Sequence, residues 1–239
     1  MSEEFEKKLQ QKLAEIRPAD RDSMEAAKAH WKTVGKPLNS LGKLEEAVVR
    51  MAGIRGKADY TIRKKGLVIM CADNGVVAEG VTQTGQEVTA IVAENFTRRA
   101  TSVCLMAEIA GTDLFPVDIG MVSDVPAVTK PEYKVMSGTK DMLLEPAMTR
   151  EQAAQAVFTG IAVAEKLAGQ GYDLLATGEM GIGNTTTSSA VAAVLLERDA
   201  AEVTGRGAGL SLEGLDRKIH VIRRSIELHR PDKEDVLDV

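Results

Sequence analysis

One glycine-rich segment with polar side chains is better suited to anion binding than any other part of this chain. Residues 178–187 read Gly-Glu-Met-Gly-Ile-Gly-Asn-Thr-Thr-Thr, between a strand-like run at 172–177 and a helix-like run at 188–196. A glycine turn between a strand and a helix directs free backbone N–H groups and the positive end of the helix dipole at an anion. Gly181 and Gly183 permit close approach of the backbone, and Asn184 and Thr185 can donate hydrogen bonds. The segment therefore predicts a phosphate site, although an ordinary strand-to-helix turn with an Asn cap has the same pattern.

Two nucleotide-binding motifs come close to this segment and fail. The Walker pattern G-x-x-x-x-G-K-[ST] would run from Gly178 to Thr185, but Asn184 replaces its lysine. The dinucleotide pattern G-x-G-x-x-G would need a third glycine where Thr186 stands. We therefore expect neither ATP hydrolysis nor NAD binding.

A second glycine cluster, Thr-Gly-Arg-Gly-Ala-Gly at 204–209, precedes the last predicted helix. By itself it is typical of a flexible loop. Beside the first cluster, Gly205, Arg206, Gly207 and Gly209 predict the other half of a phosphate cradle, and Lys218 lies about two turns into the following helix. A helix N-terminus stabilises an anion by roughly 0.3–1 kcal/mol when exposed. Two such turns and one lysine can hold a monophosphate without magnesium.

Acidic residues follow or end the predicted strands. Asp73 and Asp118 stand near glycines at the ends of two apolar runs, and Glu179 stands in the first glycine segment. Each alone is typical of a turn or a helix cap. In a parallel sheet the carboxyl ends of the strands meet at one edge, so we expect the three acids to converge on one site. Glu179 would repel a phosphate and is expected to face another part of a substrate.

The hydrophobic pattern predicts an N-terminal helical subdomain at 1–60 and an α/β core at 61–239. Apolar runs predict strands at 67–72, 114–119 and 172–177. Helical patterns occupy 86–98, 101–110 and 211–229, and Thr149 opens a further helix with a capping box. Strands that alternate with helices predict a parallel, Rossmann-like sheet flanked by helices.

Composition narrows the functional classes. The chain has 239 residues, of which 44% are hydrophobic and 27% charged, and a formal net charge of -5. The lack of basic excess argues against nucleic acid, and no run approaches the length of a membrane span. Two cysteines make no disulfide scaffold, the three histidines show no metal spacing, and the acidic N-terminus is unlike a signal peptide. We expect a cytoplasmic protein that binds a small molecule and needs no metal or cofactor.

Taken together, these segments resemble the nicotinate-nucleotide:dimethylbenzimidazole phosphoribosyltransferases, which prepare the lower ligand of cobamides. The resemblance covers nearly the whole chain. It is carried by the segments 36–45 (KPLNSLGKLE), 72–76 (ADNGV), 79–81 (EGV), 86–89 (QEVT), 118–120 (DIG), 178–187 and 204–209, and by Lys218. Asn39 stands where the family often has glycine, a mild departure because Asn tolerates the left-handed conformation.

The resemblance implies transfer of phosphoribose from nicotinate mononucleotide to an aromatic base, which is a benzimidazole, a purine or a phenol. Carboxylates near the ribose would stabilise an oxocarbenium-like transition state, and the resemblance leaves Glu179 and Asp118 as the candidates. Glu179 is also the best substitute for a general base. The remaining implied contacts are to substrate: Asp73, Thr82, Gln86, Met180, Gly181, Gly183, Asn184, Thr185, Gly205, Arg206, Gly207, Gly209 and Lys218. Met180 is equally well explained as a core residue.

The family is also homodimeric and continues for about a hundred residues beyond Leu237, with further strands and the main general base. We therefore expect the sheet in this chain to be incomplete, with apolar edges and faces uncovered. The alternative function is that of a non-catalytic nucleotide-binding fragment, or of a divergent homologue that lacks the general base.

Overall fold

The computed structural model describes residues 3–239 and divides into two compact units, Met1–Arg63 and Lys64–Val239. Met1 and Ser2, which open the acidic N-terminus, lie outside the described residues. The boundary expected from the sequence falls after residue 60. Among residues 3–239, no helix combines the length and the apolar character that a membrane crossing requires.

The described residues of the first unit form three helices, α1 (Glu3–Ala14), α2 (Arg21–Thr33) and α3 (Lys43–Arg55). Helices α2 and α3 pack through a small core in which Ala27, Val49 and Ala52 are buried. Lys36 and Glu45 form a largely buried ion pair of 2.6 Å between Nζ and Oε1. Asn39 has a φ of 56°, the left-handed conformation for which Asn is suited.

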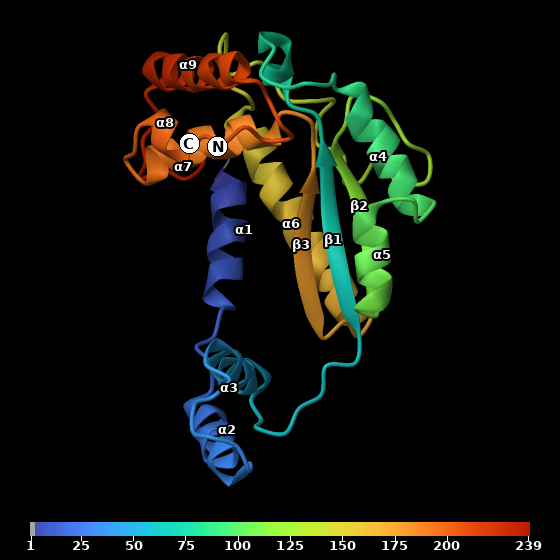
Figure 1. Cartoon of the computed structure of the whole chain (residues 1–239), viewed down its shortest axis with the longest axis vertical. Coiled ribbons are helices and arrows are strands. Elements are labelled where there is room, and N and C mark those ends of the chain that lie inside the picture. The colour runs from blue at the N-terminus through green and yellow to red at the C-terminus, as the bar shows by residue number, and fades with distance from the viewer. Residues whose placement is uncertain (1–2) are drawn as a thin grey trace. The chain divides into compact units, whose positions relative to one another are not determined.

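The second unit is built on a parallel sheet of three strands in the order β2-β1-β3 (Figure 1). The strands are β1 (Lys65–Ala72), β2 (Thr112–Gly120) and β3 (Leu174–Met180). The prediction of a parallel α/β sheet is therefore confirmed. Pro116 lies within β2, which is an edge strand, the position where a residue without an N–H is tolerated.

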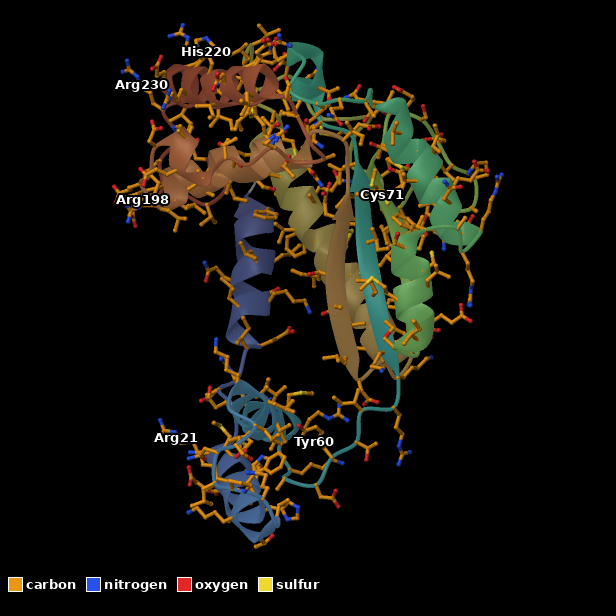
Figure 2. The ribbon with its side chains drawn as sticks, viewed as in Figure 1. Arg21, Tyr60, Cys71, Arg198, His220 and Arg230 are labelled. Carbon is orange, nitrogen blue, oxygen red and sulfur yellow. The ribbon has the colours of Figure 1, made fainter. Side chains whose placement is uncertain are left out.

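Helices cover both faces of the sheet, which explains why the strands read as unbroken apolar runs. Ile69 and Cys71 of β1 pack in one core with α4 (Glu87–Thr97) and α5 (Ser102–Ile109). Val68 of β1 packs in a second core with α6 (Arg150–Gly169). Figure 2 places Cys71 within the sheet, and burial raises the pKa of its thiol to about 12, so it behaves as a core residue.

Three further helices near the end of the chain pack against one another, α7 (Asn184–Leu195), α8 (Ala200–Val203) and α9 (Leu212–His229). Val221 and Ile222 of α9 are buried in a core with Val76. His220 on the same helix is exposed, as Figure 2 shows. Two short elements lie outside the predicted helices, α8 and the 3-10 helix η1 (Gly75–Glu79). The predicted capping box is present at the start of α6, where Thr149 and Gln152 bond each other's backbone.

Candidate functional site

The two glycine-rich segments line a single cavity of about 180 Å³ in the second unit. Its walls are formed by residues 181–185, 206–210 and 81–84, and Lys218 of α9 also borders it. Of the side chains and turns predicted for the site, the cavity brings together Thr82, Gly181, Gly183, Asn184, Thr185, Arg206, Gly207, Gly209 and Lys218. Gly205 is connected to these residues because its carbonyl oxygen accepts a hydrogen bond from Nζ of Lys218.

The first turn depends on glycine at two positions. Gly183 is the N-cap of α7 and has a φ of 93°, a conformation that L side chains rarely adopt. A Cβ atom added to Gly181 would lie 2.3 Å from the carbonyl oxygen of Ala72 at the end of β1. Glycine therefore lets the turn pack directly on the sheet, and α7 starts at Asn184, earlier than the helical pattern predicts.

Two buried polar residues that the sequence reasoning did not select hold this turn in place. Asn74 donates from Nδ2 to the carbonyl oxygen of Ile182 at 3.0 Å. The backbone N–H of Ile182 donates to Oγ1 of Thr89 at 3.0 Å. Asn74 follows directly on the acid at the end of β1, which is the signal that could have identified it.

The second glycine turn, like the first, has glycines with positive φ and a close approach to a neighbouring segment. Gly207 and Gly209 have φ values of 55° and 110°. A Cβ on Gly207 would lie 2.9 Å from Oγ1 of Thr185, so the two turns approach each other as closely as glycine allows. Arg206 donates from Nε to the carbonyl oxygen of Leu210, which closes the loop onto the start of α9.

Lys218 is enclosed, and it has no acidic partner among the residues that the structure describes. Only 1% of its surface is exposed, and its Nζ donates to Oγ1 of Thr185 at 2.7 Å and to the carbonyl oxygen of Gly205 at 3.2 Å. Within residues 3–239 it takes part in no ion pair. Burial accordingly lowers the pKa of Lys218. A buried cation without a counter-ion is costly, and an anion in the cavity would offset that cost.

We call the cavity lined by residues 81–84, 181–185, 206–210 and Lys218 the cradle, and three backbone N–H groups add hydrogen-bond donors to it. In the described part of the chain, the N–H groups of Thr185, Gly207 and Ala208 donate no hydrogen bond. All three residues line the cavity. Free N–H groups at the start of a helix and in a turn with positive φ are the donors that anion sites use.

Glu179 borders this cradle without lining it. It lies near the end of β3 and accepts a hydrogen bond at Oε2 from Nδ2 of Asn184. Burial of the carboxyl group raises the pKa of Glu179, and the hydrogen bond from Asn184 opposes that rise. Part of the side chain stays exposed. A carboxyl group with a raised pKa beside a cavity is suited to accept and return a proton.

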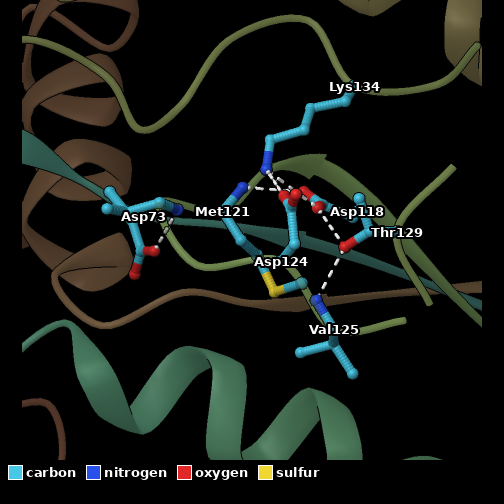
Figure 3. Close-up of polar contacts among 8 residues, drawn as sticks. Asp73, Asp118, Met121, Asp124, Val125, Thr129 and Lys134 are labelled. Atoms are coloured by element: carbon cyan, nitrogen blue, oxygen red, sulfur yellow. Dashed lines mark hydrogen bonds and ion pairs between the residues drawn. The ribbon is translucent and has the colours of Figure 1, made fainter. Parts of the chain in front are cut away.

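The three acids lie near one another, since all three carboxylates act on the pKa of the Cys71 thiol, but only Glu179 borders the cavity. Asp118 is fully buried, and its two oxygens accept from the N–H of Met121 and from Oγ1 of Thr129, both at 2.7 Å (Figure 3). Lys134 lies 3.3 Å from the same carboxylate. Asp73 is 2% exposed and accepts from the N–H of Val122 at 2.8 Å. Both acids therefore bond residues of the segment 121–149, which follows β2. Their side chains lie at adjacent strand ends, where this segment is closer to them than the cavity is.

Gln86 and Met180 also lie outside the lining of the cradle. Gln86 donates from Nε2 to the carbonyl oxygen of Asn74 at 2.9 Å. Met180 packs against the core on the α4 and α5 side of the sheet, in agreement with the interpretation of that residue as part of the core. Thr82 does line the cradle, and its hydroxyl donates to the carbonyl oxygen of Thr84 at 2.8 Å.

Comparison with known proteins agrees with the resemblance. Residues 16–239 match the family model described as phosphoribosyltransferase. The nicotinate-nucleotide–dimethylbenzimidazole phosphoribosyltransferase of Clostridium tetani is 45% identical over 98% of this chain and 64% of its own length. The protein of the same name from Acetivibrio thermocellus is 43% identical over 97% of this chain and 66% of its own length.

Solved structures give the same result for the fold. CobT from Thermus thermophilus superposes with a TM-score of 0.81 at 36% identity, over 87% of this chain and 62% of that chain. The chain thus spans a little under two thirds of the relatives it matches. With a family model that covers residues 16–239, this chain belongs to the phosphoribosyltransferase family of nicotinate-nucleotide–dimethylbenzimidazole enzymes.

Proposed function

We propose that this protein transfers the 5-phosphoribosyl group of nicotinate mononucleotide to 5,6-dimethylbenzimidazole or a related aromatic base, with release of nicotinate. The names of the relatives support this reaction. The single observation that carries it is the enclosed, unpaired Lys218 between two glycine turns with free backbone donors. Such a cradle fits the phosphate of a mononucleotide.

In this proposal the phosphate lies among the N–H groups of Thr185, Gly207 and Ala208 and the ammonium of Lys218. Arg206 lines the same cavity and adds a second positive charge. The ribose then extends toward Asn184 and Glu179. A phosphate fixed at one end aligns the anomeric carbon with the incoming base, and such alignment lowers the barrier before any chemical assistance acts.

Glu179 is the proposed catalytic carboxyl group. Nicotinate leaves from a pyridinium, so the leaving group needs little assistance, and the positive charge that develops on the ribose favours a nearby carboxylate. A benzimidazole loses a proton when its nitrogen is alkylated, and Glu179, whose pKa burial raises, is placed to accept it. Asp118 takes no part, because its oxygens are already bonded.

Two further properties follow from the resemblance and belong to the same proposal. The protein acts in the cytoplasm, and it works as a homodimer. Light scattering of the purified chain would give a mass of twice 25.6 kDa if it dimerises. A mass of one chain at assay concentration would contradict the dimer while leaving the cradle intact.

Calorimetric titration tests the cradle directly. Nicotinate mononucleotide should bind at least about tenfold more tightly than nicotinate riboside, since hydrogen bonds to a charged group contribute about 1.5–3 kcal/mol. The Lys218→Met variant should lose that difference. Arg224→Gln provides the control on the same helix, because Arg224 is exposed and pairs with Glu227. Equal affinity for the two ligands in the wild-type chain would refute the cradle.

Turnover is tested separately by chromatography of nicotinate released in the presence of each base. Release should require 5,6-dimethylbenzimidazole, a purine or a phenol, and the panel identifies the preferred acceptor. Binding without any release would favour the alternative of a non-catalytic nucleotide-binding protein. A Glu179→Gln variant should bind the mononucleotide as before and release nicotinate about 10²–10⁴-fold more slowly, the usual effect of losing a general base.

A further inference from the structure

A second cavity, of about 490 Å³, lies beside the edge strand β2 and shares no lining residue with the cradle. It is lined from the second unit alone, by residues 96–99 around the end of α4, 114–117 of β2, 127–133 of the following segment and 163–170 of α6. Its size is that of a pocket for a small organic molecule. The proposed reaction makes no use of it.

Aromatic residues are concentrated in this cavity. The chain contains four Phe, three Tyr and one Trp, and Phe96, Phe115 and Tyr133 all line the cavity. Pro116 and Leu167 extend the apolar lining. Phe96 is only 8% exposed and belongs to the core on the α4 and α5 side, so the half-buried Phe115 and Tyr133 supply the aromatic surface of the cavity. That surface favours a ligand with a flat apolar body.

The charged residues of the lining are all cations. Arg99, Lys130 and Lys166 line the cavity, and no Asp or Glu of the described part of the chain does. Neither Arg99 nor Lys130 forms an ion pair within the described residues. Lys166 donates from Nζ to the hydroxyl of Tyr133 at 3.0 Å. One carboxylate outside the lining, Glu132, is close enough to Lys166 to contribute to its raised pKa, after the hydrogen bond to Tyr133.

The chemistry of the lining selects a carboxylate over a phosphate. Helices α4 and α6 present their C-terminal ends here, at Phe96–Thr97 and Lys166–Leu167. The partial negative charge of those ends offsets part of the three positive charges. Among residues 3–239, no glycine lines the cavity to form a phosphate nest. The planar guanidinium of Arg99 can form two parallel hydrogen bonds with either anion, so the helix ends and the missing nest are what favour a singly charged carboxylate.

We propose that this cavity is a second small-molecule site, which binds a planar aromatic monocarboxylate. The ring lies against Phe115 and Tyr133, and the carboxylate meets Arg99 and Lys130. This site is independent of the cradle and of the proposed reaction, so each can fail without the other.

Calorimetry with 2-naphthoate as the probe, and 2-naphthalenemethanol as its neutral counterpart, tests this site on the full chain. The wild-type chain should bind 2-naphthoate on the order of tenfold more tightly than the alcohol, as a charge-assisted contact predicts. The double variant Arg99→Asn with Lys130→Gln should lose that preference. Asn is chosen because Arg99 has a φ of 55°, which Asn adopts readily.

Two control variants establish whether the probe binds in this cavity. Lys43→Gln with Lys57→Gln removes two exposed positive charges from the first unit and should leave 2-naphthoate binding unchanged. Lys218→Met should leave it unchanged as well, whereas loss of binding in that variant would place the probe in the cradle and overturn the proposal. Equal affinities for naphthoate and the alcohol, or full binding by the Arg99 and Lys130 variant, would also overturn it. Thermal denaturation establishes that each variant is folded.

Discussion

At the scale of single residues, Lys218 carries both the function and a cost in stability. It is almost fully enclosed, and no carboxylate among residues 3–239 pairs with it, so the folded state must desolvate a charge. We expect Lys218→Met to raise the free energy of unfolding at pH 7 by about 1 kcal/mol, because an apolar side chain of similar length removes that penalty. The same change should weaken binding of nicotinate mononucleotide at least about tenfold. Denaturant unfolding and calorimetry measure the two effects, and lower stability together with unchanged affinity would show that Lys218 is a structural residue.

Lys218 also makes the free energy of unfolding depend on pH. The pKa of Lys218 is lower in the folded protein than the ordinary value of 10.5. At a pH between the folded-state and unfolded-state pKa values, Lys218 is protonated to a greater extent in the unfolded chain than in the folded protein. Lys218 therefore makes the free energy of unfolding increase as the pH rises between these two pKa values. The Met variant should lack this contribution.

Two neighbouring glycines of the second turn form a matched pair for a further test. Gly207 has a φ of 55° and close contact with Thr185, whereas a Cβ on Gly205 would meet nothing within 4 Å. Gly207→Ala should destabilise the fold by about 1–2 kcal/mol, the usual strain of an L residue in the left-handed region, and should weaken mononucleotide binding. Gly205→Ala should change both quantities little. Similar losses in the two variants, measured by unfolding and calorimetry, would show that the turn tolerates no side chain anywhere and that the geometry of Gly207 is not special.

At the scale of elements, the first glycine turn is held by the helix that follows β1. Thr89 of α4 is fully buried and accepts the N–H of Ile182. Thr89→Val keeps the shape of the side chain but leaves that N–H without a partner, which should lower the free energy of unfolding by about 1–3 kcal/mol. Thr89→Ser should restore most of the loss. Mononucleotide affinity should fall in the Val variant and recover in the Ser variant, and a Val variant with normal affinity would mean that the turn needs no support from α4.

A second element-scale prediction concerns η1 and the segment after β2. Burial, and then a hydrogen bond with Asp141, raise the pKa of Glu79 above its ordinary value of 4.5. The folded state therefore holds a proton that the unfolded chain has released, and the stabilisation is complete below pH 4.5 and lost as pH rises through the folded-state pKa. Glu79→Gln keeps a donor and should remove this loss. The thermal midpoints of the wild-type chain and of Glu79→Gln, measured from pH 4.5 to neutral, test this effect. If both midpoints change with pH in the same way, Glu79 does not retain a proton in the folded state.

At the scale of the whole molecule, the chain consists of two units joined by a segment without helix or strand. Helix α3 ends at Arg55, β1 begins at Lys65, and the division falls between Arg63 and Lys64. Exposed chain without regular structure is where proteases cut first. Limited trypsin digestion should therefore cleave after Lys57, Arg63 or Lys64 and leave a resistant fragment that ends at Val239. Mass spectrometry identifies the fragment, and first cuts inside β1 to α9 would contradict the division.

The sequence by itself determined the class of fold and most of its elements. Apolar runs in β1 and β2 could be recognised because strands buried on both faces need a hydrophobic side chain at nearly every position. The helix that starts at Thr149 could be recognised because its capping box is local. The glycine turns could be recognised because a positive φ and a close backbone approach leave few alternatives to glycine. The first turn is shorter than predicted, since β3 runs on to Met180 and α7 starts at Asn184.

Only the tertiary structure decided which polar side chains share a cavity. Asp118, Asp73 and Glu179 look equivalent along the chain, yet two of them bond the segment after β2 and only Glu179 borders the cradle. Asn74, just after β1, and Thr89 of α4 support the first turn from positions about a hundred residues earlier in the chain, so the local sequence does not show which groups they bond. The physical reason is that a backbone conformation is set within a few residues, whereas a buried polar group bonds whichever partner the packing brings within about 3 Å.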